Sequence, residues 1–443
     1  MAEEPFDFDP RLFITGPFRP CPRCGEVQLG TLSVSNNVHA RRCRNCFHDE
    51  EERLPPLAKK LVYLDQMVLS ELAKKLDPAW REEKPGTDDF WLEAFDRIDR
   101  LVKLQLIVCP DSPIHELESS MLDRYESILR RLYKHLASGV SLRFHHEILM
   151  VQLDEAFDAW FANRDPDWSR ITRGDVVRGR LDRWSEQLLL TVNMGHFPGE
   201  IENRRKSRRR AHEVLQQFWD RRASQSQRSF EQLFQEERRG VAVAALQAFV
   251  VHVERWQGMT TDHEEISDPL QLFMPGWLVQ LVSWVLYRLG ESGVPHDDQL
   301  QQAAKFLHSE QALSAPENDL GALLYASLGW RAAHGQKSVP GQGTPNDIQF
   351  IAAYLPYCDA MFIDNEFAQL LSEGRLAEAV SRFSARIFCY RSRDDFLAYL
   401  KELEEEADSA HVSLVTRTYG ETWTEPYRSI LEDERGKGTR DRS

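Results

Sequence analysis

The chain has few cysteines for its length and no long hydrophobic run. Seven of its 443 residues are cysteines, and their uneven placement does not suit the disulfide framework of a secreted protein. The most apolar stretch, residues 272–287, is interrupted by Pro275 and Gly276 and is too short to span a bilayer, so we expect a buried helix there. The amino terminus is acidic and lacks a basic segment followed by an apolar run, which argues against a secretory signal. These absences favour a cytoplasmic protein with no membrane segment.

Basic residues are also fewer than acidic residues. The chain has 55 Lys and Arg against 70 Asp and Glu, a formal net charge of -15. Bulk attraction to nucleic acid is thereby excluded, so any such contact needs local basic patches or cations held by carboxylates. There is no glycine-rich phosphate loop, which argues against a nucleoside triphosphatase. The length and the 42% hydrophobic content predict a folded protein of two or three units.

The amino-terminal segment contains two pairs of cysteines with the spacing of a zinc site. Cys21 and Cys24 form one Cys-x2-Cys pair, Cys43 and Cys46 form the other, and 18 residues separate the pairs. Two such pairs can place four thiolates tetrahedrally around one zinc ion. So short a unit cannot bury an adequate core, so the metal would supply much of its folding energy. We therefore predict a zinc ribbon over residues 1–55.

Two basic segments are candidate nucleic-acid contacts. The first is the group of arginines around the cysteine pairs, at positions 23, 41, 42 and 44. The second places six cations within seven residues: Arg204, Arg205, Lys206, Arg208, Arg209 and Arg210. Either segment could contact a phosphate backbone. The alternatives are a purely structural ribbon and a solvated helix face beside acidic neighbours.

Residues 56–410 alternate between strand and helix patterns, except in the middle. Short apolar runs predict strands at 61–64, 104–109, 360–363 and 385–390, each with a helical pattern after it. This alternation predicts an α/β unit with a parallel sheet. Between about 140 and 310 we find helical periodicity and no convincing strand, which predicts an all-helical insertion. Residues 411–443 are expected to form a carboxyl-terminal tail.

Acidic residues gather where the predicted strands end. Five of them directly follow a strand or lie in the first turns of a neighbouring helix: Asp65, Glu116, Glu118, Asp347 and Asp364. Because the carboxyl ends of parallel strands share one edge, these side chains should converge there. Asp347 joins them only if its helix begins above that edge. Clustered carboxylates repel one another unless a cation compensates, and Mg²⁺ or Mn²⁺ bound to such oxygens can promote phosphodiester cleavage.

Each of these acids also has a structural explanation. Asp65 and Asp364 could cap the helices that follow them, and Asp347 lies in a near capping box. Glu116 and Glu118 could stabilise the positive end of their helix. The combination of four acids at equivalent sheet-edge positions favours the functional interpretation.

Three segments resemble the PIN-like nuclease family. Residues 61–70 are similar to the family's opening strand, acidic residue and helix. Residues 107–117 resemble its strand–proline–helix segment with a glutamate, and residues 346–366 resemble its paired aspartates. The resemblance implies a parallel sheet flanked by helices, here interrupted by the helical insertion and preceded by the zinc ribbon.

The same resemblance implies the chemistry of the site. Asp65, Glu116, Asp347 and Asp364 would bind Mg²⁺ or Mn²⁺ for endonucleolytic cleavage, commonly of RNA. Glu116 and Glu118 stand two positions apart on a helix, so only one of them can face the site, and the adjoining leucine favours Glu116.

One part of the motif departs from the family. Many members have Thr or Ser and then Asn after the first aspartate, whereas Gln66 and Met67 stand there in this chain. The usual polar support of Asp65 is therefore an open question.

The sequence leads to one main functional hypothesis and two alternatives. The main one is a Mg²⁺- or Mn²⁺-dependent endoribonuclease, with RNA favoured over DNA. The resemblance to the family also suggests a toxin or defence effector. An inhibitory or regulatory protein partner is a further expectation. The first alternative is a non-catalytic nucleic-acid-binding adaptor that uses the ribbon and the basic helix. The second is a protein-interaction scaffold built on the helical insertion.

Overall fold

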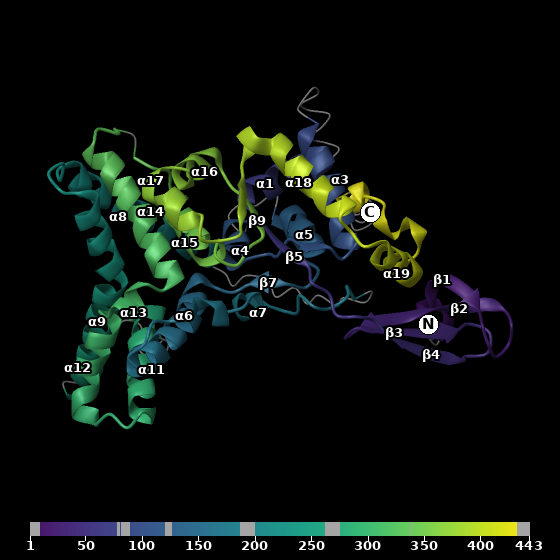
Figure 1. The fold of residues 1–443 in the computed structure, drawn as a ribbon, viewed down its shortest axis with the longest axis horizontal. Coiled ribbons are helices and arrows are strands. Elements are labelled where there is room, and N and C mark those ends of the chain that lie inside the picture. The colour runs from purple at the N-terminus through teal and green to yellow at the C-terminus, as the bar shows by residue number, and fades with distance from the viewer. Residues whose placement is uncertain are drawn as a thin grey trace, which may run out of the picture.

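The computed structural model describes residues 9–77, 80, 89–119, 126–186, 200–261, 275–337 and 339–431. Figure 1 shows three parts along the long axis of the molecule: an amino-terminal sheet in purple, a central α/β body, and a group of long helices in teal and green. The molecule is mixed α/β, with a small parallel sheet in its body.

The amino-terminal part is a four-stranded antiparallel sheet in the order β1-β2-β3-β4. It follows a short 3-10 helix, η1 (Pro10–Phe13), and its strands are β1 (Thr15–Pro20), β2 (Val27–Ser35), β3 (Val38–Cys43) and β4 (Asp49–Arg53). One cysteine pair lies in the turn from β1 to β2, and the other lies at the turn from β3 to β4. The buried cluster between them consists of Leu29, Cys21 and Cys43. So small a core agrees with a unit that depends on bound metal.

The central sheet is parallel and has the order β10-β9-β5-β6. Its strands are β5 (Lys60–Leu64), β6 (Ile107–Val108), β9 (Ala360–Phe362) and β10 (Arg386–Phe388). Along β5, Leu61 and Tyr63 belong to one hydrophobic cluster, and Val62 and Leu64 belong to another. Because successive strand residues point to opposite faces, the sheet separates two cores.

Helices cover both faces of this sheet. One face packs against α1 (Gln66–Leu76), α3 (Phe90–Lys103), α5 (Glu126–Ala137) and α18 (Arg393–Glu405). The other packs against α6 (His145–Phe161), α14 (Pro316–Ala333), α15 (Thr344–Tyr354), α16 (Asn365–Leu371) and α17 (Gly374–Val380). Helix α4 (Pro113–Ser119) follows β6, and η3 (Tyr390–Ser392) follows β10. The predicted alternation of strands and helices is confirmed, although β6 is shorter than the expected strand at 104–109 because residues 104–106 form the turn after α3.

The middle of the chain is mainly, but not entirely, helical. Its further helices are η2 (Trp168–Arg170), α7 (Arg173–Val176), α8 (Glu200–Ala223), α9 (Phe230–Thr261), α11 (Trp277–Glu291), α12 (His296–Leu307) and α13 (Glu310–Leu313). The prediction of an all-helical insertion is wrong at one point, because β7 (Ser141–Leu142) pairs antiparallel with β8 (Val177–Arg178). Strands of two residues are too short to leave an alternating pattern in the sequence.

The apolar stretch around residue 280 forms the amphipathic helix α11. It buries Val282, Val285 and Leu289 in a cluster with α6, α9 and α12, while Tyr287 on its other side is 64% exposed. No helix in the described ranges is long and apolar enough to cross a membrane.

The segment after α18 is structured up to residue 431, where the sequence suggested a tail. It contains α19 (Ser409–Tyr419), η4 (Glu421–Thr424) and η5 (Arg428–Leu431). Val415 and Tyr419 of α19 share a buried cluster with Val34, Leu54 and Trp184. Helix α19 thus packs the amino-terminal sheet against the body. Residues 432–443 lie outside the described residues.

Candidate functional site

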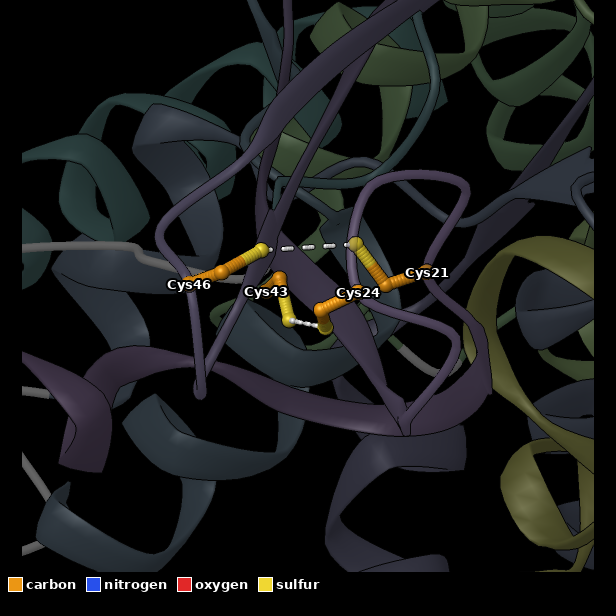
Figure 2. Close-up of side chains that lie close together, drawn as sticks. All are labelled: Cys21, Cys24, Cys43 and Cys46. Carbon is orange, nitrogen blue, oxygen red and sulfur yellow. Dashed lines mark hydrogen bonds between the residues drawn. The ribbon is translucent and has the colours of Figure 1, made fainter.

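The four cysteines of the amino-terminal sheet form a compact cluster. Their Sγ atoms all lie within 4.8 Å of one another. The distance between Sγ atoms is 3.6 Å for Cys21 and Cys46 and 3.7 Å for Cys24 and Cys43 (Figure 2). A tetrahedral zinc site with Zn–S bonds of about 2.3 Å has sulfur–sulfur edges of about 3.8 Å. The cluster is therefore compatible with zinc, as the spacing of the cysteines predicted.

The surroundings of this cluster favour metal binding over a role in phosphate contact. Burial opposes ionisation of the Cys21 thiol, but hydrogen bonds from neighbouring backbone and cysteines outweigh it and lower the pKa of Cys21 to about 6, whereas burial raises the pKa of its neighbour Cys46 to about 12. The thiolate is the form that binds metal. Three of the nearby arginines are engaged within the ribbon: Arg41 with Glu52, Arg42 with Asp49, and Arg44 with the Ile14 carbonyl. These contacts support the structural interpretation of the ribbon.

Asp65 and Asp364 lie at the carboxyl ends of adjacent strands. Leu64 of β5 pairs with Phe362 of β9, and the Asp65 N–H donates to the Phe362 carbonyl at 3.0 Å. Both aspartates also cap helices: Asp65 Oδ1 accepts from the Gln66 N–H at 2.6 Å, and Asp364 Oδ1 accepts from the Phe367 N–H at 2.8 Å. The capping explanation is thus correct for both residues. It occupies one oxygen of each carboxylate and is compatible with a second role.

Asp65 is buried and lies within the electrostatic influence of two other acids. Asp65 is only 8% exposed. Burial raises its pKa to about 7; the negative charges of Glu118 and Asp364 act in the same direction, whereas the hydrogen bond from the Gln66 N–H opposes them. Residues from the starts of α1 and α16 and from α4 therefore share one electrostatic environment. A cation at this edge would relieve both the burial penalty and the repulsion.

Glu118, and not Glu116, is the acid of α4 that lies toward this edge. Glu118 is half-buried and its Oε1 accepts a hydrogen bond from Asn346 Nδ2 at 3.2 Å. Glu116 is exposed, and its charge instead raises the pKa of Asp111, after the larger effect of burial. The leucine that favoured Glu116 in the sequence does not determine the rotation of the helix. The packing of α4 determines its rotation. Residues two positions apart on a helix, such as Glu116 and Glu118, point to widely separated faces.

Asn346 also locates the start of α15. Asn346 contacts Glu118, so the first turn of α15 lies at the same edge of the sheet as Glu118. This is the condition under which Asp347 can join the other acids there. Asp347 is half-buried in that turn, and its backbone N–H donates to the Gly343 carbonyl at 3.0 Å. We refer to Asp65, Glu118, Asp347 and Asp364 together as the acidic edge.

Two residues of this region were not recognised from the sequence as supporting groups. Gln66 is 6% exposed, and its Nε2 donates to Ser119 Oγ at 3.1 Å. This bond joins the start of α1 to the end of α4, so Gln66 helps to set Asp65 against Glu118. The position of Gln66, directly after Asp65, was the available signal. Its partner lies 53 residues away, which only the folded chain brings within reach.

The acidic edge offers hard oxygen ligands without a closed cage. Within the described ranges, only the cysteine cluster brings three or more candidate ligand atoms within 4.8 Å of one another. Mg²⁺ is commonly bound by one or two carboxylates and keeps several waters. The residues present therefore fit a hydrated cation. A shallow hollow of about 580 Å³ is lined in part by Asn365, Gln369 and Arg391, but none of the acids of the acidic edge lines it.

The basic segment lies on α8. Lys206, Arg209 and Arg210 are exposed there. The side chains of Arg204, Arg205 and Arg208 lie outside the described residues. The segment thus remains a predicted nucleic-acid contact.

Comparisons of the chain with protein-family models, with curated proteins and with solved structures found no match in any of the three.

Proposed function

We propose that this chain is a divalent-cation-dependent endonuclease of PIN-like type that hydrolyses phosphodiester bonds in RNA. The observation that carries the proposal is that Asp65 and Asp364 follow adjacent strands at the carboxyl edge of the parallel sheet, where, beside burial, the charges of Glu118 and Asp364 raise the pKa of Asp65. Ligand sites of open α/β sheets are formed at this edge. A coupled, partly buried group of carboxylates is a costly arrangement for a purely structural region.

The acidic edge would hold Mg²⁺ or Mn²⁺ through the oxygens of Asp65, Glu118 and Asp364, with Asp347 as a further ligand. When bound, such a cation supplies an activated water and neutralises charge on the scissile phosphate. The helix caps hold Oδ1 of Asp65 and of Asp364 in fixed positions. The hollow lined by Asn365, the residue that follows Asp364, would offer an open surface for a nucleic-acid strand.

The test is cleavage of labelled RNA in the presence of Mn²⁺ by the full chain and its variants. Asp65→Asn, Glu118→Gln and Asp364→Asn should each cut at least about 100-fold more slowly than the parent, because each removes a charge that binds the cation. Labelled single-stranded DNA, assayed in parallel, establishes the preference between the two nucleic acids.

Glu116→Gln is the matched control for Glu118→Gln, since it makes the same chemical change on the other face of the same helix. It should cut RNA at the parent rate. Equal cutting by the parent and all three acidic-edge variants would exclude the proposal. Salt-sensitive RNA binding without cation-dependent cutting would favour the adaptor, which receives less support because Arg41, Arg42 and Arg44 are engaged within the ribbon.

A further inference from the structure

A second candidate site lies at the opposite edge of the parallel sheet. It is a cavity of about 350 Å³, lined by the ends of α3 and α5, by residues 179–186 and by Trp423 of η4. Gln105, which lines it, lies just before β6, and the Lys60 N–H at the start of β5 donates to the neighbouring Leu106 carbonyl. The cavity is thus at the amino ends of the strands, whereas Asp65 follows the carboxyl end of β5. We call it the basic cavity.

The lining of the basic cavity is rich in cations. Five basic side chains line it: Lys103, Lys134, His135, Arg180 and Arg183. Glu186 is the acidic residue among the lining groups. This excess of positive charge occurs in a chain whose formal net charge is -15. A local concentration of cations in a concave site attracts anions.

Some of these cations are already neutralised by the protein. The fully buried Asp99 accepts from His135 at 2.6 Å and lies 2.8 Å from the Lys103 ammonium. Arg180 pairs with Asp182 at 2.7 Å. These contacts build the wall of the cavity and leave the remaining cations to meet a ligand.

Lys134 and Arg183 are the cations left for a ligand. Both are half-buried, and neither makes a direct hydrogen bond or ion pair within the part of the chain that the structure describes. Each has one acidic neighbour at longer range, since Lys134 acts to lower the pKa of Asp111 and Arg183 that of Asp182. Partial burial of a cation costs free energy unless an anion compensates. Lysine and arginine are the usual protein groups that bind phosphate.

The backbone of the basic cavity is held in uncommon conformations. Four lining residues have positive φ: Gln105 at 63°, Ser138 at 46°, Gly139 at 78° and Gly179 at 96°. Gln105 and Ser138 lie just after α3 and α5, where a left-handed residue commonly terminates a helix, so these conformations fix the shape of the cavity wall. A Cβ on Gly179 would lie 2.5 Å from the Gly139 carbonyl oxygen, so only glycine allows this close approach.

Side chains also hold the cavity in shape. Gln105 Oε1 accepts from the N–H and the hydroxyl of Ser185 at 3.0 and 2.9 Å. The indole N–H of Trp184 donates to the Pro55 carbonyl, and that of Trp423 donates to the Lys103 carbonyl. Trp184 is buried, so the half-buried ring of Trp423 is the one that adds apolar surface to this basic site. Basic groups beside aromatic rings suit a phosphate attached to a flat apolar group.

We propose that the basic cavity binds a phosphate-bearing ligand of mononucleotide size, with Lys134 and Arg183 contacting the phosphate. The volume lies in the range of small-molecule sites. The same chemistry is offered by a free nucleotide and by the phosphorylated end of an RNA strand. The site is separate from the acidic edge, and the proposal does not depend on the nuclease activity.

The experiment is calorimetric titration of the full chain, without added divalent cation, with AMP, adenosine and a short 5′-phosphorylated RNA oligonucleotide. The parent should bind AMP or the oligonucleotide with a Kd below about 1 mM, and adenosine at least about 10-fold more weakly. Lys134→Gln and Arg183→Gln should each weaken binding at least about 10-fold. Preference for AMP identifies a free nucleotide as the ligand, and preference for the oligonucleotide identifies an RNA end.

Lys305→Gln on α12 is the matched control, because it removes an exposed positive charge outside the cavity. This variant should bind the phosphorylated probes as tightly as the parent does. Circular dichroism establishes whether each variant is folded. Because two variants are tested independently, the experiment remains decisive if one of them does not fold. The proposal is overturned if the parent binds neither phosphorylated probe, or if folded Lys134→Gln and Arg183→Gln bind as tightly as the parent.

Discussion

At the scale of single residues, Asp65 combines a structural and a proposed chemical role. Its Oδ1 caps α1, while burial and two acidic neighbours raise its pKa to about 7. Either role alone would explain an aspartate at this position. The coupling to Glu118 and Asp364 is what distinguishes a candidate ligand from an ordinary cap, and it depends on residues far away in the sequence.

Lys59 offers a residue-scale test of burial. It is 4% exposed, and burial lowers the pKa of its ammonium from 10.5 to about 8. Between these values the unfolded chain binds more protons than the native one, so this group makes stability rise with pH from about 8 to 10.5. Lys59→Met should remove that dependence and stabilise the protein at pH 7 by up to about 3 kcal/mol.

The measurement is urea unfolding of parent and variant at pH 7 and at pH 10. The difference between the two proteins should be large at pH 7 and small at pH 10. A variant that is less stable than the parent at pH 7 would mean that the Lys59 ammonium gains more from its surroundings than burial removes.

At the scale of elements, the starts of α1 and α16 explain why capping and the proposed cation binding are difficult to separate by simple deletion. Parallel strands deliver the chain to one edge, and the next helix starts there with a cap. The residue type that caps well is also a good ligand for a hard cation. Serine and asparagine are exceptions, since both cap well but carry no charge.

Asp364→Ser should therefore keep the stability of α16 while removing the proposed ligand. We expect the free energy of unfolding to change by only a few tenths of a kcal/mol for Asp364→Ser and to fall by about 1 kcal/mol for Asp364→Ala. Urea unfolding compares the two variants, and the RNA assay should find both inactive. Full cutting by Asp364→Ser would show that Asp364 acts only as a cap.

At the scale of the whole molecule, the amino-terminal sheet and the body differ in what stabilises them. The sheet has the small cluster of Leu29, Cys21 and Cys43 at its four-cysteine end, whereas the body has two hydrophobic cores on either side of its own sheet. Removal of zinc should therefore affect the two parts unequally.

Removal of the metal with a chelator should unfold β1–β4 and leave the body folded. Structural zinc in small domains contributes roughly 10–16 kcal/mol of binding free energy at neutral pH, more than such a sheet retains without it. Hydrogen exchange should accelerate at least about 100-fold in β2 and β3 and stay unchanged in β5 and β9. The variant Cys24→Ser should behave in the same way without chelator. Protection of β2 and β3 in the metal-free protein would contradict this expectation.

Much of this architecture could be predicted from the sequence because it depends on local patterns of residues. The cysteine spacing predicted the four-sulfur cluster, and the apolar runs predicted β5, β9 and β10 because buried parallel strands are continuously hydrophobic. The order of strand, acid and helix also placed Asp65 and Asp364 at one edge, since strand direction is fixed once the sheet is parallel.

Tertiary structure decided what local patterns do not contain. Helix packing turned Glu118 rather than Glu116 toward Asp65, and the fold brought Gln66 to Ser119 and Asn346 to Glu118. The pairing of β7 with β8, the docking of α19 and the basic cavity likewise arise from contacts between distant segments. Residue type and spacing determine which groups a chain can offer. Only packing, which depends on all segments at once, determines which of those groups meet.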